Sequence, residues 1–228
     1  MKAYIKQTEE SSLFEQAKVG FIKMGYECIY YKDIPEDLTK EDVVIGYIGD
    51  MQRAFLKLGI PIPETIDYPQ ELEPFLARKI KKIGYLELPI EEFPYFIKSV
   101  IHKGFSGKVI REFKDLIGVS EIELYYTEDL LDIYSEYRVY IQNKEIVGVK
   151  HYKGDSFISP NEGTVINMIN SYTSQPNTYT LDVGVCLIED RFKTILIEAN
   201  QGYSVGNYGL PELQYAKFLR DGYMQYVL

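Results

Sequence analysis

Hydrophobic and polar positions follow two different patterns along the 228 residues of the chain. In the first part, apolar side chains recur at helical spacing over residues 11–24 and 51–58, and apolar runs at 2–6, 27–31 and 43–47 are typical of strands. The run 43–47 is apolar throughout, which indicates a strand buried on both faces. Strands and helices in this order predict a small α/β layer with a partly parallel sheet.

The pattern changes near residue 80. Prolines gather between residues 61 and 74, and we interpret this stretch as a connector with one helix over 71–82 that ends in solvated charges. Short strand patterns then follow one another at 83–88, 94–101, 107–113, 121–126, 137–142, 145–151, 179–188 and 193–199, with helix patterns at 160–171 and 211–219. A hairpin turn is predicted at Asn143-Lys144. We therefore expect an α/β domain over residues 1–80 and an antiparallel α+β domain over 81–228.

Charge and composition narrow the functions open to the chain. The formal net charge is −9 and there is no basic run. Nucleic acids and anionic membranes attract clustered Lys and Arg, so the charge balance disfavours both as partners. No apolar run approaches the roughly 20 residues of a membrane span. Cys28 and Cys186 lie far apart and fit no metal-binding spacing, which indicates a reducing compartment, and we expect a cytoplasmic protein.

Three oxygen-bearing side chains fall on two successive strand patterns near the end of the chain. Glu198 and Asn200 are two residues apart, so on a strand they point to the same face. Asp182 joins them if the two strands pair as a hairpin. Oxygen ligands of this kind suit Mg²⁺. The alternative is the polar, solvent-facing side of a half-exposed sheet, and the isolated pattern does not decide between them.

A single lysine, Lys98, interrupts an otherwise apolar strand pattern over residues 95–100. A buried lysine needs a partner, and a phosphate oxygen is a suitable one. The loop that follows, 102–108, contains two glycines, a serine and Lys108, so its backbone N–H groups could surround a phosphate. The alternative is a hairpin turn with exposed lysines.

On the strand pattern 135–140, Glu136, Arg138 and Tyr140 share a face. Arg138 can hold a phosphate or carboxylate through two parallel hydrogen bonds, or it can be half of a surface ion pair. The preceding segment, 127–132, links two strand patterns. Its backbone groups could hydrogen-bond an adenine edge, and Asp132 could accept from ribose hydroxyls.

The order of these features resembles the nucleotide-binding half of the ATP-grasp superfamily. It is most similar to the small R2K-type clade of bacterial and phage ATP-grasp proteins, through the segments 135–140, 151–155, 181–184, 198–206 and 208–210. The resemblance covers residues 83–215, whereas residues 1–80 resemble the preceding N-terminal domain in layout. The fold it implies is a small α/β domain followed by antiparallel-sheet nucleotide-binding subdomains.

The resemblance also implies a role for each matching residue. ATP contacts would fall on Lys98, Lys108, Glu128, Leu130 and Asp132; Mg²⁺ ligands on Asp182, Glu198 and Asn200; catalysis on Arg138 with Lys98; and the acceptor pocket on Lys150 and Tyr152. Segment 127–132 would be the hinge that holds adenine.

The activity implied by the resemblance is that of an ATP-dependent ligase. A carboxylate would be activated as an acyl phosphate and then joined to an amine or another nucleophile, with ATP and Mg²⁺ as cofactors. The substrates could be small molecules, peptides or proteins. The alternative is a non-catalytic ATP-binding or interaction module. The two histidines, His102 and His151, have no cysteine nearby, and the ligase mechanism needs no covalent nucleophile.

Overall fold

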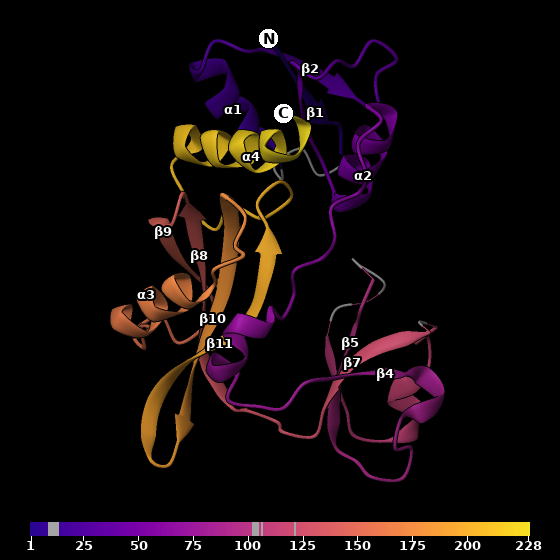
Figure 1. The fold of residues 1–228 in the computed structure, drawn as a ribbon, viewed down its shortest axis with the longest axis vertical. Coiled ribbons are helices and arrows are strands. Elements are labelled where there is room, and N and C mark those ends of the chain that lie inside the picture. Colours follow the sequence, from indigo (N-terminus) through magenta and orange to yellow (C-terminus); the bar gives the residue numbers. More distant parts are fainter. Residues whose placement is uncertain (9–13, 102–104, 106, 121) are drawn as a thin grey trace.

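The computed structural model describes residues 1–8, 14–101, 105, 107–120 and 122–228. Three β-sheets follow one another through the molecule, with an N-terminal sheet at one end, a long central sheet, and a small sheet beside it (Figure 1). The predicted combination of an α/β part and antiparallel α+β parts is confirmed.

The N-terminal sheet has the strand order β2-β1-β3, and both pairings are parallel. Its strands are β1 (Lys2–Lys6), β2 (Glu27–Tyr31) and β3 (Val43–Ile45), so the sheet is fully parallel where a partly parallel one was predicted. The buried run of β3 matches its apolar sequence. The helices are α1 (Glu15–Lys23) and α2 (Ile48–Lys57).

The last helix of the chain, α4 (Glu212–Val227), packs on this N-terminal layer (Figure 1). It extends well beyond the predicted end at residue 219. Gly222, inside the helix, permits its close approach to the chain at Gly202, because a Cβ at position 222 would lie 2.4 Å from the Gly202 carbonyl carbon. The core of residues 1–60 therefore also contains Tyr203, Val205, Leu210 and the buried face of α4. The domain division at residue 80 stays a prediction.

The central sheet is antiparallel, in the order β11-β10-β8-β9. Its strands are β8 (Ile133–Gln142), β9 (Glu145–Gly154), β10 (Thr178–Ile188) and β11 (Arg191–Gln201). The turn between β8 and β9 is the predicted one, with Asn143 and Lys144 at φ of 50° and 68°, as in the tightest hairpin turns. Helix α3 (Glu162–Ser171) and the 3₁₀ helix η1 (Gln70–Phe75) bury apolar side chains against one face of this sheet. The opposite face carries the polar residues described below.

The small sheet is also antiparallel, in the order β4-β7-β5-β6. Its strands are β4 (Lys81–Gly84), β5 (Tyr95–Ser99), β6 (Lys108–Ile110) and β7 (Glu123–Thr127), and short 3₁₀ helices lie at η2 (Tyr85–Glu87) and η3 (Phe113–Leu116). The predicted helix over 71–82 is wrong. The 3₁₀ helix η1 contains Pro74, and Ala77 has a left-handed φ of 52°, which ends any continuous helix before β4.

Two connectors join the small sheet to the rest of the molecule, one over residues 76–80 and one over 128–132. They are bonded to each other, since the backbone N–H of Lys79 donates to Asp129 Oδ2 at 2.9 Å. Within the described part of the chain, no helix is long and apolar enough to cross a membrane.

Candidate active site

A cavity of about 1230 Å³ is lined by the central sheet, the small sheet and both connectors. Its charged lining among the described residues consists of six carboxylates and four cations: Asp67, Asp129, Asp132, Glu136, Asp182, Glu198, Arg78, Lys98, Arg138 and Lys153. Its lining carries more negative than positive groups. An anionic ligand therefore needs accompanying cations to enter this cavity without net repulsion.

The floor of the cavity is a row of charged side chains across the central sheet. Asp182 on β10 stands directly opposite Arg138 on β8 and opposite Glu198 on β11. Directly opposed residues of antiparallel strands share a face, and Asn200, two residues beyond Glu198, shares it as well. The structure thus brings together four of the residues that the sequence singled out.

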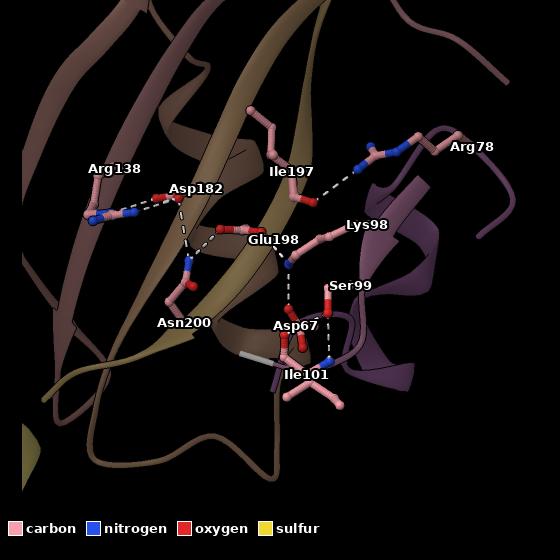
Figure 2. Close-up of polar contacts among 10 residues, drawn as sticks. All are labelled: Asp67, Arg78, Lys98, Ser99, Ile101, Arg138, Asp182, Ile197, Glu198 and Asn200. Atoms are coloured by element: carbon pink, nitrogen blue, oxygen red, sulfur yellow. Dashed lines mark hydrogen bonds and ion pairs between the residues drawn. The ribbon is translucent and has the colours of Figure 1, made fainter. Parts of the chain in front are cut away.

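These side chains are bonded to one another (Figure 2). Arg138 donates from Nε and Nη2 to the two oxygens of Asp182, at 2.8 and 2.7 Å. Asn200 Nδ2 donates to Glu198 Oε1 at 3.0 Å and to Asp182 Oδ2 at 3.4 Å. Burial raises the pKa of Asp182, and the Arg138 guanidinium opposes that rise.

Lys98 reaches this row from the other side of the cavity (Figure 2). It lies on β5 of the small sheet, and its Nζ is 2.5 Å from Glu198 Oε2 and 2.5 Å from Asp67 Oδ1. Burial alone would lower the pKa of Lys98, but the two carboxylates more than reverse this and raise it. Burial would likewise raise the pKa of Glu198, and Lys98 instead holds it below its usual value. Both groups are therefore charged at neutral pH.

A β-bulge in β11 directs Glu198 into the cavity. The register shifts after Asp182, so Asp182 pairs with Glu198 but Val183 pairs with Leu196. Leu196 and Ala199 are buried in the core on the far face, while Ile197 and Glu198 both line the cavity. One extra residue in the strand thus places two successive side chains on the same face.

Aromatic rings surround the guanidinium of Arg138. Its Cζ lies 4.9 Å from the centre of the Tyr208 ring and 6.0 Å from that of Tyr152. The two rings stack at 5.0 Å with an interplanar angle of 21°. Tyr152, a predicted acceptor-pocket residue, therefore lines the cavity, whereas Lys150 stands opposite Arg138 on β9 and is absent from the described lining.

The predicted nucleotide contacts divide into two groups. Leu130 and Asp132, on the second connector, line the cavity. Glu128 is exposed and lies 3.4 Å from Lys81, so the structure does not bring it to the cavity. Lys108 lies on β6 and stands opposite Ile97 of β5. It is therefore on the face of the small sheet away from Lys98, and it does not line the described cavity either. Residues 102–104 and 106 of the predicted phosphate loop lie outside the described residues.

Two charged residues of the cavity, Asp67 and Arg78, lie outside every segment that was predicted to form the site. Asp67 comes from the proline-rich stretch, where no motif marks it. Arg78 belongs to the charge run that we expected to be a solvated helix end. Instead its guanidinium lines the cavity and donates to the carbonyl oxygens of Leu196 and Ile197, each at 3.0 Å. Burial lowers the pKa of Arg78, as expected for a cation removed from water.

The donor chemistry of the floor suits a hard divalent cation. Among the described residues, no group of three or more His, Cys, Asp or Glu side chains is placed to hold a metal ion. The set Asp182, Glu198 and Asn200 instead combines two carboxylates with one amide, and oxygen donors of this kind match Mg²⁺. In the part of the chain that the structure describes, Glu198 has one cationic partner, the ammonium of Lys98.

Comparison with known proteins identifies the class to which this fold and site belong. Residues 75–218 match the family model of the ATP-grasp domain, R2K clade family 2. The chain therefore belongs to this family of ATP-grasp proteins, as the sequence resemblance predicted. A search of curated proteins gives no match.

Solved structures show the same fold at low sequence identity. The chain is similar to a RimK domain protein ATP-grasp from Sphaerobacter thermophilus, at 11% identity and a TM-score of 0.63, with 96% of this chain and 99% of that chain covered. It is similar to N5-carboxyaminoimidazole synthetase from Staphylococcus aureus complexed with ADP, at 13% identity and a TM-score of 0.57, with coverage of 97% and 77%. D-alanine–D-alanine ligase from Bacillus anthracis complexed with ATP is 14% identical, with a TM-score of 0.50 and coverage of 88% and 85%.

Proposed function

We propose that this protein is an ATP-dependent ligase that activates a carboxylate as an acyl phosphate and joins it to an amine or another nucleophile. The observation that carries the proposal is the pairing of cations and carboxylates from two sheets inside one cavity. Lys98 and Arg138 are the cations, and Glu198 and Asp182 are their partners. Two of the similar structures, a ligase with bound ATP and a synthetase with bound ADP, support the same class of reaction.

The nucleotide would lie between the central and small sheets. Apolar side chains line the cavity from both sheets and the second connector and offer surfaces for a base: Phe96, Val109, Leu131, Ile133 and Ile197. Leu130 and Asp132 on the connector would contact the nucleoside, with Asp132 as an acceptor for ribose hydroxyls. Lys98 would then exchange a carboxylate partner for a phosphate oxygen. Lys108 and Glu128 are not part of this proposal, because the structure does not bring them to the cavity.

Asp182, Glu198 and Asn200 would hold Mg²⁺. When bound, the ion would offset the charge of the phosphate oxygens during phosphoryl transfer. The excess of carboxylates in the cavity supports this requirement, because free ATP would bring further negative charge to a negatively charged lining. The nucleotide should therefore bind much more tightly with a divalent cation than without one.

In the proposed reaction, a carboxylate oxygen of the substrate attacks the γ-phosphorus of ATP. The bond from that phosphorus to ADP breaks, which gives an acyl phosphate and ADP. The nucleophile's nitrogen then attacks the acyl carbon, inorganic phosphate leaves, and the amine loses a proton. Arg138 would stabilise negative charge on the transferred phosphoryl group, and its guanidinium is bonded to Asp182 and lies against the ring of Tyr208. Tyr152 beside it would line the acceptor pocket.

A non-catalytic nucleotide-binding module is the competing function, and one experiment separates the two. Phosphate and ADP release from Mg·ATP should be measured with pooled carboxylic acids and pooled amines, peptides included. A ligase releases phosphate only when both pools contain a substrate, and Glu198→Gln abolishes the release while its melting temperature stays close to that of the wild type. Tight Mg·ATP binding without release in any pool would favour the module. Absence of Mg·ATP binding would refute both.

A further inference from the structure

Both peptide groups that flank Glu198 are held from the open edge of β11. β11 is an edge strand of the central sheet, so its outer N–H and C=O groups have no neighbouring strand to pair with. The carbonyl of Ile197, which precedes Glu198, accepts from Arg78 Nη2 at 3.0 Å. The N–H of Ala199, which follows it, donates to the carbonyl of Asp67 at 2.8 Å.

Arg78 also binds the backbone at the bulge in β11. Its Nη1 also donates to the carbonyl of Leu196 at 3.0 Å and to that of Leu76, on its own connector, at 2.9 Å. Leu196 and Ile197 are the residues at which the register shifts, and without this shift Glu198 would not stand opposite Asp182. The guanidinium thus binds the carbonyl oxygens of both residues at the bulge, and Figure 2 shows its contact with the Ile197 carbonyl.

The bonding of Arg78 differs from that of the other cavity cations. Among the described residues, Lys98, Arg138 and Lys153 each form an ion pair with a carboxylate, whereas Arg78 donates to backbone carbonyls and forms no ion pair there. Desolvation of its charge lowers the pKa of Arg78. Burying a cation costs free energy, and this cation is bonded to backbone carbonyls. Its contacts therefore indicate a role in holding the backbone.

We infer that Arg78 is a positioning residue, which sets the β11 bulge and thereby fixes the Glu198 carboxylate for a divalent cation. This inference rests on the proposed function, because it assigns to Glu198 the role of metal ligand. Loss of a group that orients a metal ligand typically lowers metal affinity about 10- to 100-fold. Arg78→Met should therefore weaken metal binding without weakening the binding of nucleotide in the absence of metal.

The experiment measures Mn²⁺ binding by electron paramagnetic resonance in the presence of a non-hydrolysable ATP analogue. ADP binding in the presence of a chelator is measured in parallel. Arg78→Met should raise the Mn²⁺ dissociation constant about 10- to 100-fold and change that of metal-free ADP less than about 2-fold. Arg78→Lys should recover part of the affinity, because an ammonium can still donate to the carbonyls. Lys79→Met is the matched control, since Lys79 is exposed on the same connector and bonds through its backbone N–H. It should bind Mn²⁺ like the wild type.

Two results would overturn the inference. One is an unchanged Mn²⁺ affinity in Arg78→Met. The other is an equal loss of Mn²⁺ and metal-free ADP affinity, which would show that Arg78 contacts the nucleotide itself. If Arg78→Met does not fold, Arg78→Lys decides the question, because an intermediate loss confined to Mn²⁺ supports the inference and wild-type affinity refutes it. Failure of the wild-type protein to bind Mn²⁺ with the analogue would instead refute the proposed function, and this inference with it.

Discussion

Among the ion pairs of the described residues, the Arg138–Asp182 pair should contribute most to stability. Arg138 is 9% exposed and Asp182 is 3% exposed, and two hydrogen bonds of 2.8 and 2.7 Å join them. At an effective dielectric constant of about 20, two unit charges at this distance attract by about 6 kcal/mol, which offsets the cost of burying both. Arg138→Met leaves the carboxylate buried without its cation, and such a loss costs about 3–5 kcal/mol.

Urea denaturation of four proteins tests this value: the wild type, Arg138→Met, Asp182→Leu and the double variant. The double variant should be more stable than either single variant, because it buries no unpaired charge. Arg220→Met is the matched control, since Arg220 and Asp221 form a pair at 2.7 Å in which both side chains are about one-third exposed. Its loss should cost less than about 1 kcal/mol.

The pH dependence of the free energy of unfolding tests the same pair independently. Burial raises the pKa of Asp182, and a protonated carboxyl group needs no cation. A folded-state pKa above the unfolded value adds stability at low pH that is lost as the pH rises through the folded-state value. The loss in unfolding free energy caused by Arg138→Met should therefore be smaller in acid than at neutral pH. A cost below about 1 kcal/mol, or additive effects of the two single variants, would show that the pair is not buried and coupled.

Three further predictions concern other parts of the molecule. Lys98→Ala should raise KM for ATP with a smaller effect on kcat, because it removes a ground-state phosphate contact; an effect confined to kcat in steady-state kinetics would contradict this role. Burial raises the pKa of Tyr172 to about 12, and those of Tyr203 and Tyr223 also rise, so unfolding should become easier as the pH rises above 10. The tyrosinate absorbance contributed by these buried tyrosines, which no tryptophan obscures, should then appear together with unfolding rather than before it. Gly222→Ala should destabilise the fold by about 1–3 kcal/mol in chemical denaturation, because its Cβ would overlap the Gly202 backbone, whereas Gly163→Ala, with its nearest contact at 3.4 Å, should be neutral or slightly stabilising.

Strand periodicity located much of the candidate floor before the structure was known. Glu198 and Asn200 share a face, and Ala199 between them is buried in the core, as the alternation of side chains predicted. Glu136 and Arg138 line the cavity together for the same reason. These relations depend on bond geometry within one strand, so a single stretch of sequence is sufficient to predict them.

Two other features were decided by contacts with distant parts of the chain. Lys108 lies close to Lys98 in sequence, yet the β5–β6 register places it opposite Ile97 and so on the other face. The charge pattern at the end of segment 71–82 is typical of a solvated helix end. Arg78 in this segment instead lines the cavity and donates to carbonyls of β11. Register and edge contacts are set by partners that lie far away in the chain.

The sequence by itself determined most of the strands, the main hairpin turn, the family and the charged faces of β8 and β11, because these follow from local periodicity and motif order. Tertiary structure alone decided that Lys98 meets both Glu198 and Asp67, and that Arg78 holds the bulge before Glu198. Residues 98 and 198 lie 100 positions apart, and Arg78 lies 119 positions from Ile197. Contacts over such separations form when whole sheets pack against each other, so no local pattern of side chains encodes them.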